Sequence, residues 1–521
     1  MKTAIVVGAG AGGIATAARL AKAGYKVIVV EKNNFLGGRC SLIHHGDYRF
    51  DQGPSLLLMP EVFYQTFTDL GTTPELEGLE FLKCEPNYRI WFHDNDHLEL
   101  STDLCKLKPQ LERHEGSTGL QNFFDFLHES GKHYDISMEH VLSKDFPNLL
   151  AMLRPGLLWE LLSLHVFESM YSRATRYFAS EKLRRAFTFA SMYLGMNPFE
   201  APGTYSLLQY TELAHGIFYP RGGFVKVLEA LARVGSRIGV EYRLQAEVAS
   251  VLSSQGQIRG VKLQSGEELL ADAVIINADL VYAYNNLLPP TGYADRLSKR
   301  QASCSSISFF WSLDRVIAEL QTHNVFLAEE YKESFDAIFH RHELPAEPSF
   351  YVNVPSRIDP SAAPRGKDAV VVLVPVGHLT NDPERPQDWN SLINHAREVV
   401  FETIKSRTGA SLRDSVIHES VETPMSWKSK FNLDRGAILG LSHSFFNVLS
   451  FRPKIRHDIR GLYFVGASTH PGAGVPVALS GARIVSDCIV KDFTGPPVTR
   501  YIYWMAFLFV PFVSVVFLWV L

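Results

Sequence analysis

Residues 3–31, TAIVVGAGAGGIATAARLAKAGYKVIVVE, decide the fold of this 521-residue chain. The apolar, largely β-branched run at 3–7 predicts a strand, and residues 14–23 predict a helix after a glycine-rich turn. KVIVVE at 26–31 predicts a second strand. A strand, a helix and a strand in this order place the two strands in parallel, as at the start of a doubly wound α/β sheet.

Gly8, Gly10 and Gly13 form a G-x-G-x-x-G motif between the first strand and the helix. The first glycine permits a tight turn, the second lets backbone N–H groups approach a pyrophosphate, and the third lets helix and strand pack closely. Glu31 ends the second strand, where a carboxylate can bind a ribose hydroxyl. Together these features predict a dinucleotide-binding domain.

The composition limits the other kinds of function. Apolar residues make up 46% and charged residues 20% of the chain, and the formal net charge is −4. This is the balance of a globular protein, and without a dense basic block we expect no nucleic-acid partner. The five cysteines are scattered without a C-x-x-C pair, which favours reduced thiols and predicts no metal site.

The adjacent glycines Gly37 and Gly38 are followed by Arg39. Paired glycines permit close approach of the backbone, and an arginine beside them can neutralise pyrophosphate charge. This run resembles the extended FAD fingerprint of the amine-oxidase-like flavoproteins. Gly53, Pro54 and Ser55 resemble the loop that passes beside the flavin in that superfamily. The resemblance implies FAD as the cofactor.

Two more segments carry the same resemblance. Residues 219–223 resemble a P-x-G-G turn that opens a helix, and Val248 holds the position whose backbone contacts adenine. Asp51, just before the flavin loop, leaves two interpretations open, namely a direct role at the cofactor or a turn residue.

The most specific segment is residues 461–481, GLYFVGASTHPGAGVPVALSG. It is similar, residue by residue, to the signature of the phytoene desaturase (carotenoid desaturase) family. The resemblance implies that Gly466 and Ala467 lie near the ribityl and phosphate part of FAD, and that Gly474, Val475 and Pro476 lie near its ring. His470 leaves two interpretations open, a catalytic base or a residue that fixes the loop by a hydrogen bond.

The family resemblance, which residues 197–208 and 354–364 also carry, implies stepwise desaturation of phytoene, a long apolar isoprenoid, in carotenoid biosynthesis. The allylic hydrogens of such a substrate are too weakly acidic for an ordinary side-chain base to remove alone, so the flavin has to accept a hydride. We expect an apolar tunnel, with Tyr205, Tyr210 and Phe218 as lining residues. No residue stands out as catalytic. No second G-x-G-x-x-G is present, so we expect an external electron acceptor, oxygen or a quinone.

Three alternatives stay open at this point, one of which is a saturase that acts on a retinoid. Carotene cis–trans isomerases share the expected fold and use reduced FAD without net oxidation. GDP dissociation inhibitors also share it and hold an isoprenoid without catalysis.

The chain is too long for one core, so we expect several pieces. The predicted fold class is α/β, with a Rossmann-like FAD-binding domain, an inserted α+β substrate domain and a C-terminal transmembrane helix. The FAD-binding domain is expected at 1–75, 215–280 and 455–492, the substrate domain at 76–214 and 281–454, and the membrane anchor at 501–521. Expected elements further along are a helix at 223–234, strands at 241–244, 247–252, 260–263, 273–277, 369–374 and 461–465, and a helix at 475–490.

Residues 501–521 carry no charge, and a helix of that length would span ~31 Å, about the thickness of a bilayer core. We therefore expect a lipid bilayer as partner, with the body in the cytosol at the endoplasmic reticulum and the tail resembling the fungal branch of the family. A buried or interfacial C-terminal helix is the alternative. Residues 149–167 are also apolar, which favours either a core helix or a segment that dips into the membrane interface.

Overall fold

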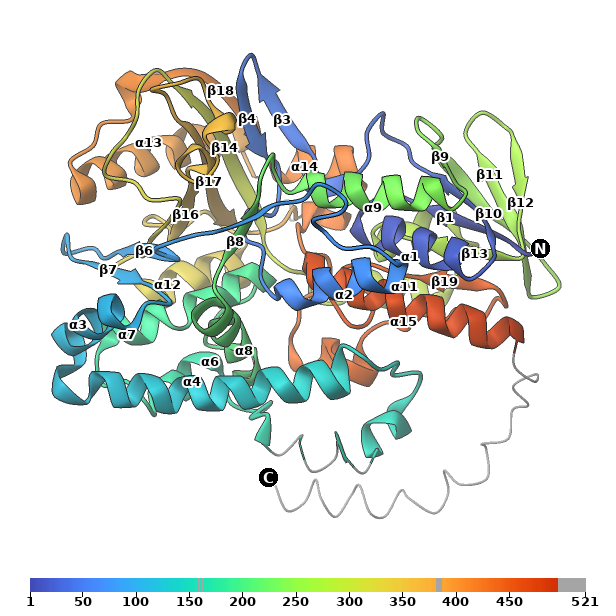
Figure 1. Cartoon of the computed structure of the whole chain (residues 1–521), viewed down its shortest axis with the longest axis horizontal. Helices are drawn as coiled ribbons and strands as arrows, with labels where there is room; N and C mark the ends of the chain where they lie inside the picture. Colours follow the sequence, from blue (N-terminus) through green and yellow to red (C-terminus); the bar gives the residue numbers. More distant parts are fainter. Residues whose placement is uncertain (155, 158–159, 161–162, 381–386, 495–521) are drawn as a thin grey trace.

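The computed structural model describes residues 1–494 except 155, 158–159, 161–162 and 381–386. A five-stranded parallel sheet with the order β19-β13-β1-β2-β9 forms one half of the molecule (Figure 1). Its strands are β1 (Thr3–Val7), β2 (Lys26–Val30), β9 (Val240–Arg243), β13 (Ala273–Ile276) and β19 (Leu462–Phe464). They come from stretches of chain that are far apart in sequence, so three segments build one sheet.

Both faces of this sheet are covered. Ala4, Val6, Val27 and Val29 point into a core shared with the helices α1 (Ala11–Lys22), α9 (Val225–Arg237) and α15 (Val475–Thr494). The alternate residues Ile5, Val7, Ile28 and Val30 pack against the antiparallel sheet of β10 (Val248–Ser254), β11 (Gln257–Leu263) and β12 (Glu268–Leu270). Burial on both sides explains why β1 and β2 are apolar throughout and do not alternate with polar residues.

A seven-stranded sheet with the order β18-β14-β17-β16-β15-β6-β7 forms the second half. Its strands are β6 (Tyr88–Trp91), β7 (His97–Leu100), β14 (Ser305–Leu313), β15 (His323–Phe326), β16 (Phe350–Asn353), β17 (Ala369–Val376) and β18 (Val416–Glu422). Helix α13 (Trp389–Thr408) covers one face with an apolar core. Strand β6 pairs with β15 in parallel, which joins the two stretches of chain assigned to the substrate domain.

Helices gather below this sheet in Figure 1. They are α3 (Leu104–Glu115), α4 (Gly119–Ile136), α6 (Met170–Ala174), α7 (Glu181–Ala186) and α8 (Leu207–Tyr210), while α2 (Pro60–Leu70) lies beside α15. Two further antiparallel pairs are the hairpin of β3 (Leu42–His45) with β4 (Tyr48–Asp51) and the long-range pair of β5 (Phe81–Lys83) with β8 (Phe218–Pro220). The domain boundaries themselves stay a prediction.

The fold class needs one correction. No helix within the described part of the chain has the length and apolar character needed to cross a membrane. The prediction of a transmembrane helix as part of this fold is therefore wrong, and the fold is an α/β sheet domain with an inserted α+β domain. Residues 501–521, to which that helix was assigned, lie outside the described residues. An apolar stretch of sequence alone is weak evidence for a transmembrane helix, because buried and interfacial segments have the same composition.

Candidate active site

A cavity of about 470 Å³ lies where the two halves meet. On one side it is lined at the carboxyl ends of β1, β2 and β13, which is where ligands bind in open parallel sheets. On the other side it is lined by residues of β14, β16 and β17. The volume lies in the range usual for small-molecule sites.

Nearly every residue predicted to bind the cofactor lines this cavity. The lining residues among them are Gly8, Gly10, Glu31, Gly38, Arg39, Gly53, Pro54, Ser55, Val248, Gly466, Ala467, Gly474, Val475 and Pro476. Gly13 is not in the lining. A Cβ atom at Gly13 would lie 2.1 Å from the carbonyl oxygen of Gly8, so this glycine lets α1 pack against the turn.

Glu31 is buried beside the glycine loop. Its Oε2 accepts a hydrogen bond from the Ala9 N–H at 2.8 Å, and its Oε1 accepts bonds from the backbone and side-chain N–H groups of Asn33 at 2.9 Å. Oε2, which accepts only this one bond, still has a second lone pair for a ligand hydroxyl. Glu31 therefore fixes the loop and also faces the cavity, and its contact with a ribose stays a prediction.

Arg39 fits an anionic group. It follows the turn at Gly37, whose N–H donates to the carbonyl of Ala9 at 2.8 Å, so the turn lies against the glycine loop. Arg39 lines the cavity, and it makes no ion pair with any of the described residues. Burial lowers the pKa of its guanidinium. A sheltered cation without a carboxylate partner, beside the uncapped N-terminus of α1, suits the pyrophosphate of FAD.

The loop at 53–55 runs against this arginine. A Cβ atom at Gly53 would lie 2.3 Å from the carbonyl oxygen of Arg39. Asp51 does not line the cavity, and its carboxylate accepts bonds from the Tyr219 hydroxyl at 2.6 Å and the Phe224 N–H at 2.7 Å. Of the two interpretations of Asp51, these contacts fit the structural one, because they tie the turn at 219–223 to the flavin loop.

His470 and His443 hold the C-terminal loop. The Nε2 atom of His470 is 2.8 Å from the carbonyl oxygen of Lys144, and His470 does not line the cavity. Burial lowers its pKa to about 4. These facts fit the loop-fixing interpretation. His443 accepts a bond from the Ala473 N–H at 3.1 Å, directly beside the cavity.

Arg452 is a residue that the motifs miss. It is 1% exposed, and its guanidinium donates to the carbonyl oxygens of Thr469, Ser442 and Asn447 at 3.2, 3.1 and 2.7 Å. It also donates to the carbonyls of Leu441 and Ala467. Burial lowers its pKa to about 10, so it stays charged at neutral pH. Arg452 thereby clamps the 441–447 loop to the cavity-lining segment at 466–469. A single arginine in a loop gives no sequence signal for this.

The three residues predicted to line the substrate tunnel lie outside the cavity lining. Tyr205 packs beside His443, Tyr210 beside Tyr134, and Phe218 pairs with Leu57. Their contact with substrate stays a prediction. The apolar and aromatic lining residues instead include Leu58, Met59, Phe189, Met192, Tyr193, Leu194, Leu208, Tyr351, Leu373, Pro375 and Trp427.

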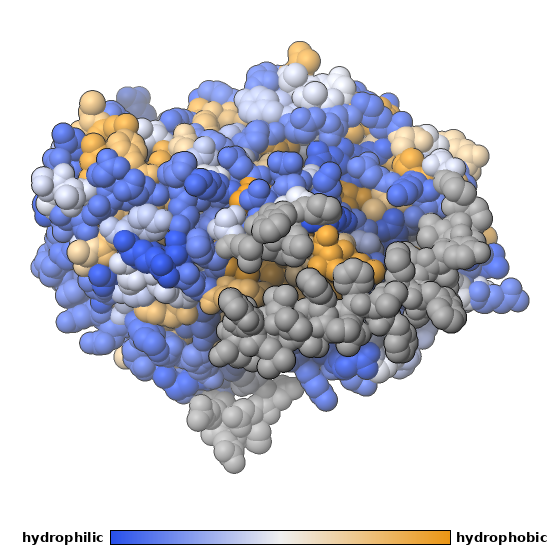
Figure 2. All heavy atoms as spheres, turned by 90° about the horizontal axis from the view of Figure 1, so that it is seen from below, coloured by the Kyte–Doolittle hydropathy of each residue, from blue (hydrophilic) through white to orange (hydrophobic). Residues whose placement is uncertain are grey.

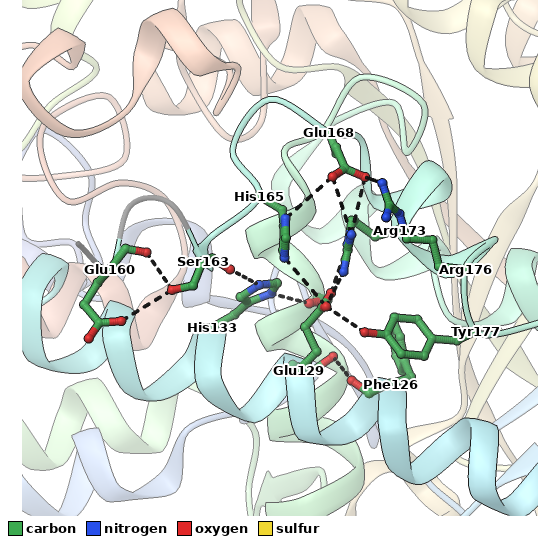
Figure 3. A network of polar contacts seen from close by, with 12 residues as sticks. Phe126, Glu129, His133, Glu160, Ser163, His165, Glu168, Arg173, Arg176 and Tyr177 are labelled. Atoms are coloured by element: carbon green, nitrogen blue, oxygen red, sulfur yellow. Dashed lines mark hydrogen bonds and ion pairs between the residues drawn. The ribbon is translucent and has the colours of Figure 1, made fainter. Parts of the chain in front are cut away.

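A second polar cluster lies away from the cavity, beside α4 (Figure 3). Glu129, His133 and His165 offer ligand atoms within 4.8 Å of one another. However, Glu129 is ion-paired with Arg173, and the ring nitrogens of His133 lie 3.1 Å from the Ser163 carbonyl and 2.8 Å from a serine hydroxyl. Burial lowers the pKa of His133 to about 4. Because these groups already bind one another, we assign the cluster to helix packing.

Comparisons with known proteins show the family of this chain. A family model described as flavin containing amine oxidoreductase matches residues 11–490. A phytoene desaturase of Fusarium fujikuroi is 58% identical over 510 residues, covering 94% of this chain and 90% of the relative. A phytoene desaturase of Neurospora crassa is 55% identical over 513 residues, covering 96% and 86%.

Solved structures show the same fold at low identity. An oxidoreductase from Methanosarcina mazei superposes with a TM-score of 0.61 at 18% identity, covering 93% of this chain and 100% of its own. The family model covers most of the chain and the fungal relatives are more than 50% identical to it, so together they show its family. The chain belongs to the flavin-containing amine oxidoreductase family and, within it, to the phytoene desaturases of the fungal type.

Proposed function

We propose that this FAD-dependent oxidoreductase desaturates phytoene in several steps in carotenoid biosynthesis. The observation that carries the proposal is a largely apolar cavity at the FAD-type dinucleotide fold, in a chain that shares more than half its residues with fungal phytoene desaturases. Because those relatives are desaturases, neither an isomerase nor a non-enzymatic isoprenoid carrier is supported.

Different residues of this chain would bind FAD and the hydrocarbon substrate. When bound, FAD accepts a hydride from the substrate. The glycine loop, Arg39 and Glu31 would hold its nucleotide part, Gly466 and Ala467 its ribityl and phosphate part, and the segment at 474–476 would lie beside its ring. The apolar lining orients a hydrocarbon chain and excludes water from it.

A product assay tests this function. Purified FAD-loaded protein is mixed with phytoene in liposomes, in air or without oxygen plus a quinone, which we propose as the two alternative acceptors. We expect polyenes that absorb at longer wavelength and are lighter by successive pairs of hydrogens. A product of unchanged mass would indicate an isomerase, and a colourless protein without flavin would indicate a carrier.

We also propose a lipid bilayer as partner, because phytoene dissolves in lipid and not in water. Five exposed apolar residues lie on segments that contact one another, and we call them the underside patch: Leu149, Leu150, Leu153, Phe167 and Phe446. The first three lie on the short helix η4 (Leu149–Leu153), which contacts η15 (Leu449–Phe451). The rings of Phe167 and Phe446 both pack on Phe445, at 4.9 and 5.1 Å.

Figure 2 views the molecule from below and shows apolar side chains gathered at the centre of this face. Phe167 and Phe446 are 76% and 71% exposed, which is unusual for phenylalanine and marks an interaction surface. Within residues 149–167, the exposed side chains support the interfacial interpretation, while the buried Leu157 and Leu164 support the core interpretation, so both stay open. The location at the endoplasmic reticulum stays a prediction.

Two aspartates in the underside patch should weaken membrane binding. Each large apolar side chain buried in lipid contributes about 1.5–3 kcal/mol, so Leu150→Asp with Phe446→Asp should lower liposome binding at least about tenfold in flotation assays. Leu270→Asp is the control, since Leu270 is 70% exposed on β12 in the other half of the molecule. Equal binding of all three proteins would contradict the assignment of this patch.

A further inference from the structure

Glu212 is a carboxyl group enclosed in the protein beside the cavity. It lies on the π-helix η7 (Thr211–His215), is 3% exposed, and forms no ion pair with the residues that the structure describes. Its Oε1 accepts a hydrogen bond from the Tyr88 hydroxyl at 3.2 Å. Buried carboxyl groups without a cation partner are rare and often mark functional sites.

A chain of hydroxyl groups connects Glu212 to the cavity. Tyr193, on the 3-10 helix η5 (Phe189–Leu194), lines the cavity, and its hydroxyl donates to the hydroxyl of Tyr88. Tyr88 in turn donates to Glu212. Both hydroxyl groups of this hydrogen-bonded relay therefore donate in the direction from the cavity towards the carboxyl group. A proton that arrives at Tyr193 can move to Glu212 by successive transfers along bonds already formed.

The electrostatics suit a proton acceptor at the end of the chain. Burial raises the pKa of Glu212 to about 8, while the two tyrosine hydroxyls lower it by a smaller amount. Burial raises the pKa values of Tyr88 and Tyr193 well above their usual range, so both tyrosines stay neutral and can only relay a proton. The other titratable groups on this side are His323 of β15 and Tyr351 of β16.

His323 offers the competing route. The hydroxyl of Tyr351, which also lines the cavity, lies 2.6 Å from Nδ1 of His323 and 2.9 Å from Oγ of Ser55. Burial lowers the pKa of His323 to about 3. Burial therefore acts in opposite directions on the two acceptors, raising the pKa of Glu212 and lowering that of His323, and this favours Glu212 as the proton acceptor.

We propose that Glu212 receives the proton released in each desaturation, through the hydroxyls of Tyr193 and Tyr88. This inference rests on the proposed function. One C–H bond of the substrate breaks with its electron pair, which leaves as a hydride to oxidised flavin. The adjacent C–H bond breaks, its electrons form the new C=C bond, and its proton goes to Tyr193 Oη. The Tyr193 proton moves to Tyr88 and the Tyr88 proton to the Glu212 carboxylate. A quinone then takes up the hydride equivalent and this proton, which restores the ionised carboxylate.

Glu212→Gln tests the relay without changing the shape of the side chain. Because only ionised Glu212 accepts a proton, kcat of the wild type should rise about tenfold per pH unit from pH ~6 to ~8 and then level off. The variant should lose about 100-fold or more in kcat, keep its KM, and lose the rise with pH. Tyr193→Phe should show the same loss, because it cuts the chain at the cavity.

Infrared titration of the FAD-loaded protein without substrate gives a second readout. A protonated carboxyl band should disappear with a midpoint near pH 8 in the wild type and be absent in Glu212→Gln. Tyr463→Phe is the matched control, since this buried tyrosine donates to Asp492 at 3.0 Å and does not line the cavity. It should keep wild-type kcat and pH profile.

The two hypotheses fail in different ways. A wild type that leaves phytoene unchanged would refute the proposed function. If the wild type desaturates phytoene and Glu212→Gln keeps its kcat within about threefold, the relay is overturned. The relay is also overturned if the wild type shows no titrating carboxyl band, or if Glu212→Gln shows the same band as the wild type.

Discussion

Gly13→Ala is expected to lower FAD affinity roughly ten- to hundredfold, although Gly13 does not line the cavity. The new Cβ atom would lie 2.1 Å from the Gly8 carbonyl oxygen, which is backbone and cannot rotate away. Helix α1 then has to shift, and forced overpacking of this kind costs about 1–3 kcal/mol. The shift moves the N-terminus of α1 and the turn at Gly8 away from the phosphates, so most of that cost should appear in the dissociation constant, measured by flavin fluorescence.

Gly292→Ala is the matched control for this prediction. Gly292 begins the helix α11 (Gly292–Ser298), and a Cβ atom there would meet only the Arg296 side chain at 3.7 Å, an ordinary contact. This variant should bind FAD as the wild type does. Wild-type affinity in Gly13→Ala would show that the loop can relax around the extra methyl group, and that close packing of α1 is not needed for the cofactor.

The first domain was predictable because its signals are local. The strand at Thr3–Val7 was predicted with these bounds, and the predicted helix at 475–490 corresponds to Val475–Thr494. In each case a short apolar run, a glycine turn and a helix follow directly in sequence, and both faces of the sheet are buried. Motif residues far apart in sequence, such as Gly8, Glu31 and Gly466, line one cavity because the carboxyl ends of parallel strands share an edge.

The second domain was less predictable because its contacts are not local. None of the expected strands lies in residues 76–214, yet β6 and β7 complete a sheet whose other strands begin at Ser305. No periodicity shows which strand β6 will pair with. The same limit applies to the tunnel. Tyr205 and Tyr210 lie in the expected substrate domain and Phe218 just beyond it, and aromatic residues serve cores as well as cavities.

The most informative side chains carry no motif. Glu212, Tyr193 and Arg452 are single residues of common types, and their roles come from burial and partners that only the fold supplies. The transmembrane prediction failed for a related reason. Composition alone did not separate a spanning helix from the alternatives that the same residues allow.

Arg452→Leu is expected to lower stability by about 3 kcal/mol or more and to release FAD, even though Arg452 lies behind the cavity. Leucine is similar in size but leaves the carbonyl groups of Thr469, Ser442 and Asn447 without their donor. Each buried acceptor left unpaired costs about 1–3 kcal/mol, and relief of the buried charge offsets only part of that sum. Thermal unfolding and the temperature of flavin release should both fall, because the 466–469 segment loses its clamp.

Two further variants separate the clamp from buried charge in general. Arg452→Lys keeps the charge and three donors. Its unfolding temperature and its temperature of flavin release should therefore lie between those of the wild type and of Arg452→Leu. Arg407 is another buried arginine. It lies on α13, outside the cavity lining, and its Nη1 donates to the Leu327 carbonyl at 2.7 Å. Arg407→Leu removes it. Arg407→Leu should lower the unfolding temperature without weakening FAD binding to the folded protein. If both leucine variants weaken FAD binding equally, the effect comes from global stability and Arg452 has no particular hold on the cofactor loop.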